Sequence, residues 1–347
     1  MPSMTAVVKA TAAPGAELVQ VRVPEPAGTD VLVEVLATSI CGTDVHIYDW
    51  NHWAAGRIHP PRVFGHEMAG RVVAVAGPVD RVKVGDYIAA ETHVVDHTCR
   101  QCLRGQFHLC ENLRILGVDR DGSFARYVLL PADNCWHNAQ GLTPEVAALQ
   151  EPFGNAVHAA TAGPLAGNTV AVFGCGPIGL CAIGIARAEG AAAVFAVEPN
   201  PYRQDLARRM GAHQVITPSG STVAELKRAN GGLGVDVVLE MSGNPLAIQQ
   251  GLEVLHAGGW ISLLGLGDAR ATLDLNELVV LKGLTIYGIT GRKIWDTWEK
   301  TSRYLSQGLV DVSPLITHRF PLTEFDEAMS IMKSRRSGKV VLMPNGS

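Results

Sequence analysis

A glycine-rich turn between an apolar run and a helical stretch constrains the fold of this chain more than any other segment. Residues 169–173 are the run TVAVF, residues 174–179 are GCGPIG, and small and apolar residues follow. Gly174, Gly176 and Gly179 permit a tight turn, close approach of a pyrophosphate to the backbone, and close packing of helix on strand. The segment predicts the first unit of a dinucleotide-binding Rossmann domain. The alternative, a glycine-rich turn that binds nothing, fits this strand and helix context less well.

The rest of the second half alternates between apolar runs and helical stretches. Strand candidates lie at 194–197, 235–240, 260–264 and 284–288. Asn200-Pro201 and Asn244-Pro245 each place a good N-cap residue before a proline at the first helical position, directly after a strand. This alternation predicts an α/β fold with a doubly wound parallel sheet.

The first 150 residues have a different pattern. β-rich runs at 5–9, 31–37, 70–76 and 87–90 are separated by proline, glycine and aspartate, which predicts a β-rich, barrel-like domain. A final strand candidate at 339–343 is expected to rejoin that domain. At about 150 residues per domain, the 347 residues suggest two domains. We place them at 1–151 with 292–347, and at 152–291.

Composition excludes several classes of function. The chain has 29 Lys and Arg against 33 Asp and Glu, a formal charge of −4, so charge gives no reason to expect a nucleic-acid partner. Residues 168–186 carry no charge, but the glycine turn interrupts them, and we expect a strand and a helix instead of a membrane span. The first 14 residues lack the pattern of a signal peptide. We therefore expect a cytoplasmic protein with no membrane partner.

An acidic residue after the second strand of the α/β half indicates which dinucleotide binds. Glu198 lies 19 residues past Gly179 and can accept hydrogen bonds from the adenosine ribose while repelling a 2′-phosphate. Arg203 is a competing signal, because a nearby guanidinium could accept that phosphate. With Glu198 present, the pattern favours NAD over NADP.

Cysteines and one histidine in the β-rich half point to metal chemistry. Cys41, His66 and Glu67 supply a thiolate, an imidazole and a carboxylate, and a catalytic zinc site uses three protein ligands with one open position. From spacing alone, the alternatives stay open: a small buried Cys41, a hydrogen-bonded core His66 and a surface Glu67.

Beyond these patterns, several segments resemble a known family along nearly the whole chain. CGTDVHIYDW at 41–50, GHE at 65–67, the cysteines near residue 100 and the GCGPIG turn are similar to the zinc-dependent medium-chain alcohol dehydrogenases. Together with 41–50, ILGVDRDG at 115–122 and EPFGNAVH at 151–158 resemble the L-threonine 3-dehydrogenase branch. The resemblance implies a GroES-like catalytic domain, a Rossmann domain and a zinc ion in the cleft between them.

The resemblance also assigns expected roles to individual residues. It implies that Cys41, His66 and Glu67 bind the catalytic zinc, that Glu151 can join or leave its shell, that Thr43 and His46 relay a proton, and that His93 lies near the substrate. Around the cofactor it implies Ile178, Glu198, Arg203, Leu264, Gly265, Leu266, Ile289 and Thr290, besides the three glycines. Without the family, Thr43 as a turn residue and His46 as a surface histidine would be the better interpretations.

The family's second, structural zinc is held by four cysteines, and here the chain departs from the pattern. Cys99, Cys102 and Cys110 keep the family spacing, but Asp96 occupies the first position. A carboxylate can bind zinc, although it is an uncommon ligand in structural shells. His97 could substitute for it, and a lobe without metal is the remaining alternative. The three retained thiols favour a lobe that holds zinc, and Asp96 is then the candidate fourth ligand.

The implied activity is the NAD-dependent, zinc-dependent oxidation of L-threonine at C3 to L-2-amino-3-ketobutyrate. A polyol or other secondary-alcohol dehydrogenase of the same family is the rival hypothesis, because the pocket sets the substrate. A catalytically silent NAD-binding module is disfavoured, since it needs neither an open zinc site nor a proton relay. The family further implies a homotetramer.

Overall fold

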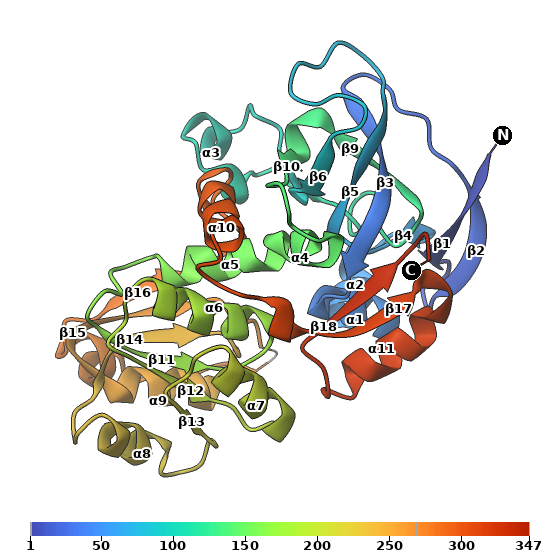
Figure 1. Ribbon diagram of the computed structural model, residues 1–347. Coiled ribbons are helices and arrows are strands. Elements are labelled where there is room, and N and C mark those ends of the chain that lie inside the picture. Colours follow the sequence, from blue (N-terminus) through green and yellow to red (C-terminus); the bar gives the residue numbers. More distant parts are fainter. Residues whose placement is uncertain (1, 268, 347) are drawn as a thin grey trace. The chain divides into compact units, whose positions relative to one another are not determined.

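The computed structural model describes residues 2–267 and 269–346, which divide into two compact units (Figure 1). The first consists of Met1–Glu151 and Ile316–Ser347, and the second of Pro152–Leu315. The sequence-based division placed 292–315 in the first unit instead. These residues belong to the second because helix α10 (Asp296–Ser306) packs there: Trp298 is buried, and Tyr304 contacts Phe153 and donates a hydrogen bond to Glu189.

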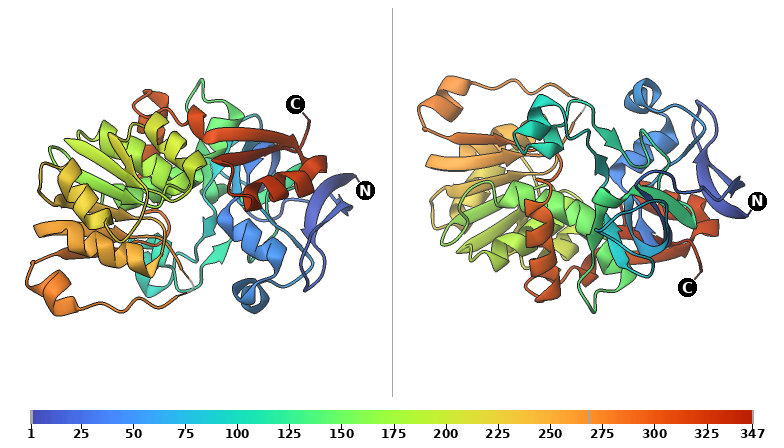
Figure 2. Two further views of the ribbon diagram at one scale, coloured as in Figure 1. Left: turned by 90° about the horizontal axis from the view of Figure 1, so that it is seen from below. Right: turned by 90° about the horizontal axis from the view of Figure 1, so that it is seen from above.

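The first unit is built on β-strands, as predicted. Its large sheet has the order β10-β6-β5-β3-β18-β17, with β9 also paired to β3, beside the small sheets β2-β1-β4 and β7-β8. The strands are β1 Ser3–Lys9, β2 Glu17–Arg22, β3 Asp30–Ser39, β4 Arg62–Val63, β5 Glu67–Val75, β6 Tyr87–Ala90, β7 His93–Val94, β8 Arg114–Ile115, β9 Tyr127–Pro131, β10 Cys135–His137, β17 Ile316–Pro321 and β18 Lys339–Met343. Figure 2 shows β17, β18 and α11 (red) in the same unit as the N-terminal strands (blue).

Short helices fill the connections of the first unit. They are α1 Gly42–Asp49, α2 His52–Arg57, α3 Arg100–Leu103, α4 Pro144–Ala148 and α11 Phe325–Lys333. Strand β3 is mostly buried, and its valines join one core cluster with Met68. A second core cluster gathers around Phe64, Phe124 and Phe325. The three phenylalanine rings lie 5.3–5.6 Å apart, and they hold α11 and the turn before β5 in place.

The second unit is the predicted doubly wound parallel sheet, with strand order β13-β12-β11-β14-β15-β16. Its strands are β11 Thr169–Phe173, β12 Ala193–Val197, β13 Gln214–Ile216, β14 Val235–Glu240, β15 Leu255–Leu263 and β16 Thr285–Gly288. Its other helices are α6 Pro177–Ala188, α7 Pro201–Arg209, α8 Thr222–Ala229 and α9 Pro245–Val254, and α5 Gln150–Ala160 begins at the boundary between the units. Asn200 and Asn244 cap α7 and α9 through their side chains, as predicted.

The order of the strands identifies where such a sheet binds ligands. From β11 the chain winds through β12 to β13, then returns to β14 on the other side of β11 and winds the opposite way. Since crossovers are right-handed, α6 and α9 lie on opposite faces of the sheet (Figure 1). The carboxyl ends of β11 and β14 therefore form the switch point, where open α/β sheets bind ligands.

Within 2–267 and 269–346, the structure contains no helix that is both long and apolar enough to cross a membrane. The uncharged stretch 168–186 forms β11, the glycine turn and most of α6, as expected from the sequence.

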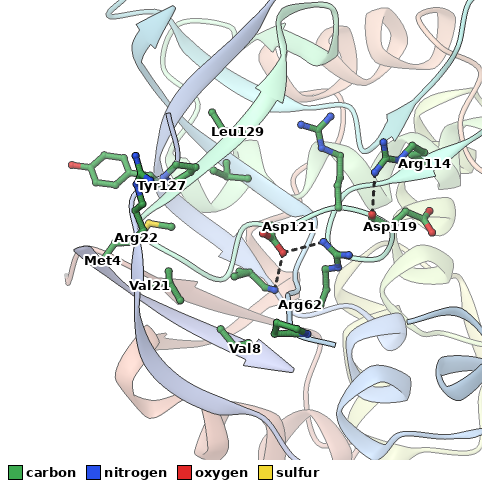
Figure 3. A pocket seen from close by; sticks show the side chains of 16 residues that line it. Met4, Val8, Val21, Arg22, Arg62, Arg114, Asp119, Asp121, Tyr127 and Leu129 are labelled. Carbon is green, nitrogen blue, oxygen red and sulfur yellow. Dashed lines mark hydrogen bonds and ion pairs between the residues drawn. The ribbon is translucent and has the colours of Figure 1, made fainter. Parts of the chain in front are cut away.

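A cavity of about 450 Å³ lies in the first unit, and none of the site residues predicted from the sequence lines it (Figure 3). Arginines and apolar side chains line it, and Arg62 donates a hydrogen bond to Asp121 there. The candidate chemistry lies elsewhere in the chain.

Candidate metal centres and nucleotide-binding site

The first turn of α1 fixes the thiol of Cys41. Cys41 is the N-cap residue, and its backbone N–H donates a 2.8 Å hydrogen bond to Oδ2 of the fully buried Asp44. The Cys41 Sγ lies 3.8 Å from the hydroxyl oxygen of Thr43. A capping interaction therefore places a thiol and a hydroxyl side by side at the start of this helix.

A tight turn and the pairing of two strands fix the positions of His66 and Glu67. Gly65 has a φ of 89°, and a Cβ there would lie 2.2 Å from the Phe124 ring, so only glycine fits. His66 follows, and Glu67 begins β5 opposite Ser39 of β3. The hydroxyl of Ser39 and the ammonium of Lys339 both donate to Oε2 of Glu67.

These residues form a group that fits a metal ion. Ligand atoms of Cys41, His66 and Glu67 all lie within 4.8 Å of one another. Oε1 of Glu67 is buried and accepts no hydrogen bond, although Oε2 has two donors. Buried polar atoms are normally satisfied, and a cation on this oxygen would satisfy it. Thiolate, imidazole and carboxylate are zinc donors, so the residues present fit a zinc ion.

The buried carboxylate of Asp44 lies next to the imidazole of His66. Nδ1 of His66 lies 3.7 Å from Oδ1 of Asp44, and neither atom has a hydrogen-bond partner. Burial lowers the pKa of His66, but Asp44 and Cys41 outweigh that effect and raise it to about 10. The negative surroundings favour a cation, and a carboxylate behind a ligating histidine typically fixes its tautomer.

Two further predicted site residues, Glu151 and His93, belong to the same unit. Glu151 is buried and accepts a 3.3 Å hydrogen bond from the Thr92 hydroxyl, but it is not among the three residues whose ligand atoms lie within 4.8 Å. Its charge contributes to the raised pKa of His66, after those of Asp44 and Cys41. Nδ1 of His93 lies 3.3 Å from Oε1 of the buried Glu91.

The four residues of the cysteine lobe also come together. Ligand atoms of Asp96, Cys99, Cys102 and Cys110 lie within 4.8 Å of one another. The sulfurs of Cys99 and Cys110 are 3.9 Å apart. Two thiolates each about 2.3 Å from one tetrahedral ion would lie about 3.8 Å apart, so the spacing fits zinc.

Of the two alternatives for the fourth ligand, Asp96 joins this group and His97 does not. The His97 ring packs edge-on against Phe107, with centroids 5.6 Å apart. Oδ1 of Asp96 accepts hydrogen bonds from the backbone N–H of Thr98 and Cys99, and Oδ2 accepts one from Asn112. These hydrogen bonds, above all the one from the Cys99 N–H, lower the pKa of Asp96, so its carboxylate stays charged.

The glycine turn of the second unit has the form of a phosphate site. Gly174 has a φ of 87°, and a Cβ on Gly179 would lie 2.0 Å from the carbonyl oxygen of Gly174, so both positions require glycine. A Cβ on Gly176 would meet no atom within 4 Å. Gly176 is the N-cap of α6 and has no side chain to cap its amides, which leaves room and donors for an anion.

Glu198 connects this turn to the end of β12. Its Oε2 accepts a 2.7 Å hydrogen bond from the Cys175 N–H, and its Oε1 accepts a 2.9 Å bond from the Asn200 N–H. Arg203 lies in the first turn of α7, and Ile178 is half-buried at the start of α6. Glu198 and Arg203 therefore both lie at the carboxyl end of the sheet.

The remaining predicted cofactor residues follow β15 and β16. The N–H groups of Leu264 and Gly265 donate to the Glu240 carbonyl, and that of Ile289 donates to the Leu263 carbonyl. Leu266 and Thr290 are exposed. All these positions lie at the same edge of the sheet as the glycine turn, where a bound dinucleotide would extend.

Comparison with known proteins identifies the family. A model of the alcohol dehydrogenase GroES-like domain matches residues 27–140, and a model of zinc-binding dehydrogenases matches 177–307. The chain belongs to the zinc-binding dehydrogenases. L-threonine 3-dehydrogenases from Caldanaerobacter subterraneus subsp. tengcongensis and Pyrococcus horikoshii are 50% and 48% identical to it, covering 98% of this chain and 99% and 98% of theirs.

A solved structure shares the fold of this zinc-binding dehydrogenase. The 2R,3R-butanediol dehydrogenase from Bacillus subtilis has a TM-score of 0.88 at 29% identity, covering 99% of this chain and 100% of that one. The expected family and the expected pairing of a GroES-like with a Rossmann domain are confirmed.

In this zinc-binding dehydrogenase the predicted site residues also contact residues that the sequence did not reveal. Asp44, Ser39 and Lys339 surround the Cys41 group, and Asn51 contacts His46. The position of Asp44, three residues after an N-cap, was a signal that could have revealed it. Lys339 gives no such signal, because it reaches Glu67 across 272 residues of sequence.

Proposed function

We propose that this zinc-binding dehydrogenase oxidises L-threonine at C3 to L-2-amino-3-ketobutyrate and uses NAD as the hydride acceptor. The observation that carries the proposal is the group of Cys41, His66 and Glu67, in which His66 and Glu67 are buried and one carboxylate oxygen has no partner. The relatives that are about half identical along the whole chain supply the substrate. The likeness to a butanediol dehydrogenase is weaker, so a polyol or other secondary alcohol is the less favoured substrate.

Cys41, His66 and Glu67 are the residues that would hold zinc. Bound there, zinc supplies a Lewis acid that makes an alcohol acidic enough to lose its proton near neutral pH. Lys339 and Ser39 hold one oxygen of Glu67 and leave the other available. In the same proposal Glu151 is a nearby acid that can enter the ligand shell, and His93 contacts the substrate.

Thr43 and His46 are suited to move the released proton. They are three residues apart on α1, which puts them on one side of the helix. The Thr43 hydroxyl can accept and donate a proton next to the Cys41 sulfur. His46 is exposed, and an imidazole can exchange its proton with water in the neutral pH range.

The turn at Gly174, Gly176 and Gly179 would bind the NAD pyrophosphate, and NAD supplies the oxidant. Glu198 is already oriented by two backbone N–H groups, and its negative charge opposes a 2′-phosphate there. These two hydrogen bonds leave lone pairs on the Glu198 carboxylate, which can accept hydrogen bonds from ribose hydroxyls. This arrangement supports NAD over NADP despite the presence of Arg203. Ile178, Leu264, Gly265, Leu266, Ile289 and Thr290 complete the proposed cofactor site.

The cysteine lobe would hold a second, structural zinc through Asp96, Cys99, Cys102 and Cys110. The 3.9 Å separation of two sulfurs and the charged, hydrogen-bonded Asp96 support this assignment. In this role the ion contributes folding energy to a short and exposed segment.

We further infer a homotetramer in the cytoplasm. Strand β16 ends the parallel sheet, and Ile286 on it and Val280 and Leu281 before it are exposed apolar residues. An apolar sheet edge of this kind suits pairing with the same edge of a second copy, and dimers of dimers are common closed assemblies. The seven cysteines are free thiols, which suits a reducing compartment.

An assay of NADH formation tests the proposed function. The zinc-loaded protein is supplied with L-threonine, sorbitol or 2,3-butanediol, and with NAD or NADP. We expect the highest kcat/KM with L-threonine and NAD, and no turnover after removal of zinc with a chelator. Preference for either polyol would replace the substrate assignment, and preference for NADP would contradict the role of Glu198.

A further inference from the structure

One asparagine connects the two short helices that follow Cys41. Asn51 is the N-cap of α2, and its Oδ1 accepts a 3.0 Å hydrogen bond from the Ala54 N–H. Its Nδ2 lies 2.9 Å from Nδ1 of His46 on α1. The backbone N–H of Asn51 also donates to the carbonyl of His46, at 3.3 Å. The same residue thus caps one helix and contacts the imidazole of the other.

The capping bond determines which way the amide faces. Only the oxygen of an asparagine side chain can accept from Ala54, so the amide nitrogen must face His46. That nitrogen is a donor and carries no lone pair for hydrogen bonding. Nδ1 of His46 must therefore be the acceptor, and the single hydrogen of the neutral ring lies on Nε2.

We propose that Asn51 is a positioning residue that holds His46 as the Nε2–H tautomer. In the other tautomer, the hydrogen on Nδ1 would face the N–H of Asn51. Two donors would then oppose each other, and a reversal of the amide would sacrifice the bond to Ala54. The Trp53 ring, edge-on to His46 at 6.4 Å, further restricts rotation of the imidazole.

The charged residues on the helices around His46 do not offer another explanation for its tautomer. On α1, Asp44 bonds to the Cys41 amide and faces His66, and Asp49 pairs with Lys333 of α11 at 2.6 Å. On α2, Arg57 pairs with Asp119 at 2.7 Å, which leaves His52 as the other titratable group of that helix. Also on α11, Asp326 accepts from the Tyr48 hydroxyl. In the described part of the chain, no ion pair involves His46.

The consequence for catalysis rests on the proposed function, in which His46 delivers protons to water. The tautomer decides that Nε2 is the ring nitrogen that donates and Nδ1 the one that accepts. Asn51 would thereby set which nitrogen of the relay histidine donates, and it would act only through His46.

The tautomer can be measured without any assay of activity. Magic-angle-spinning ¹⁵N NMR of sedimented, histidine-labelled holoenzyme distinguishes a ring nitrogen that carries hydrogen from one that does not. The chain has 12 histidines, and the spectrum of His46→Gln identifies the His46 signals by their loss. We expect neutral His46 to have an unprotonated Nδ1 and a protonated Nε2. The reverse assignment would overturn the proposal, whatever the substrate of the enzyme.

Two matched variants then test the effect on proton transfer. Asn51→Asp keeps a good N-cap but replaces the donor with a carboxylate, which favours Nδ1–H and the charged ring. Asn51→Ser also keeps a cap, but its hydroxyl is one atom shorter than the amide and loses the contact with His46. Because both variants retain the cap, their melting temperatures should stay close to that of the parent protein.

In the pH profile of kcat with L-threonine, Asn51→Asp should move the acidic limb to higher pH by about one unit. Asn51→Ser adds no charge, so any movement of the limb should be smaller. A profile of Asn51→Asp that is unchanged or moved to lower pH would overturn the proposal. If the parent protein does not oxidise L-threonine, the proposed function fails, while the NMR result still decides the tautomer.

Discussion

The buried group of Cys41, His66 and Glu67 and the cysteine lobe at residues 96–110 each bring candidate ligand atoms within 4.8 Å, but the chain builds them in different ways. The buried group draws on α1, the turn before β5 and, through Lys339, the last strand of the unit. The lobe takes all four residues from one short segment that contains only the four-residue helix α3 and a single 3-10 turn.

This difference indicates where the energy that holds each site comes from. Sheet pairing and a phenylalanine core position the buried group, so its geometry exists before an ion binds. The lobe has few apolar contacts of its own, and Leu103 and Leu109 are exposed on it. A bound ion is therefore expected to stabilise the lobe, whereas in the buried group it is expected mainly to provide chemistry.

Replacement of one thiol should lower kcat in one site and the melting temperature in the other. This is the largest difference that we expect between the two sites. Cys41→Ser removes a soft ligand from the reacting centre and should lower kcat about a thousandfold or more, because a bound metal contributes several kcal/mol to the transition state. NAD binding, measured by fluorescence titration, should persist, because the nucleotide residues belong to the second unit.

The matched variant Cys99→Ser should leave kcat within a few-fold of the parent value but lower the melting temperature. Normal turnover of Cys41→Ser with its zinc retained would show that Cys41 is not a ligand in the catalytic site. Loss of turnover in Cys99→Ser without loss of stability would reverse the roles of the two sites.

Lys339→Met tests whether long-range contacts hold the buried group. Lys339 and Glu67 are both buried, and in the zinc-free protein removal of the ammonium leaves a carboxylate without its charge partner, which typically costs about 3–5 kcal/mol. Lys333→Met is the control, because its pair with Asp49 is 43% and 40% exposed and should contribute at most about 1 kcal/mol. Equal free energies of unfolding for the two variants, from urea denaturation, would contradict this account.

The sequence predicted the ligands of both sites more completely than their supports. Cys41, His66, Glu67 and the lobe cysteines belong to short motifs, and the glycine turn lies between a strand and a helix that follow from local patterns. Ser39 and Lys339 could not be predicted, because their contacts with Glu67 depend on the pairing of β3 with β5 and β18. Residues 292–315 were misplaced for the same reason, since the packing of Tyr304 on Phe153 leaves no local signal.

Asp96→Cys should strengthen zinc binding in the lobe, because it restores four thiolates. We expect roughly tenfold tighter retention of the second zinc and a higher melting temperature, because an ion that binds only the folded state stabilises it. Metal analysis of the parent protein is the control, with two zinc ions expected per chain. If the parent holds one ion and only the variant holds two, the natural lobe is metal-free.

Asn112→Ala should have the smallest effect. Asn112 donates to Oδ2 of Asp96 and so orients a ligand without binding the ion. Its loss should accelerate zinc release from the lobe by roughly tenfold and leave kcat unchanged, as expected for a residue behind a metal ligand. Release rates equal to those of the parent would show that the backbone bonds from Thr98 and Cys99 are sufficient to orient Asp96.

The most direct test of the two-site account follows zinc content and threonine-dependent NADH formation together while a chelator is added in small steps to the holoenzyme. The account predicts two phases. The first zinc leaves the lobe, which takes all its ligands from one short segment, with little loss of activity and a fall in melting temperature. The second leaves the group of Cys41, His66 and Glu67 as activity disappears. Activity that falls in proportion to the first ion released, or a full-strength enzyme after both ions have gone, would contradict it.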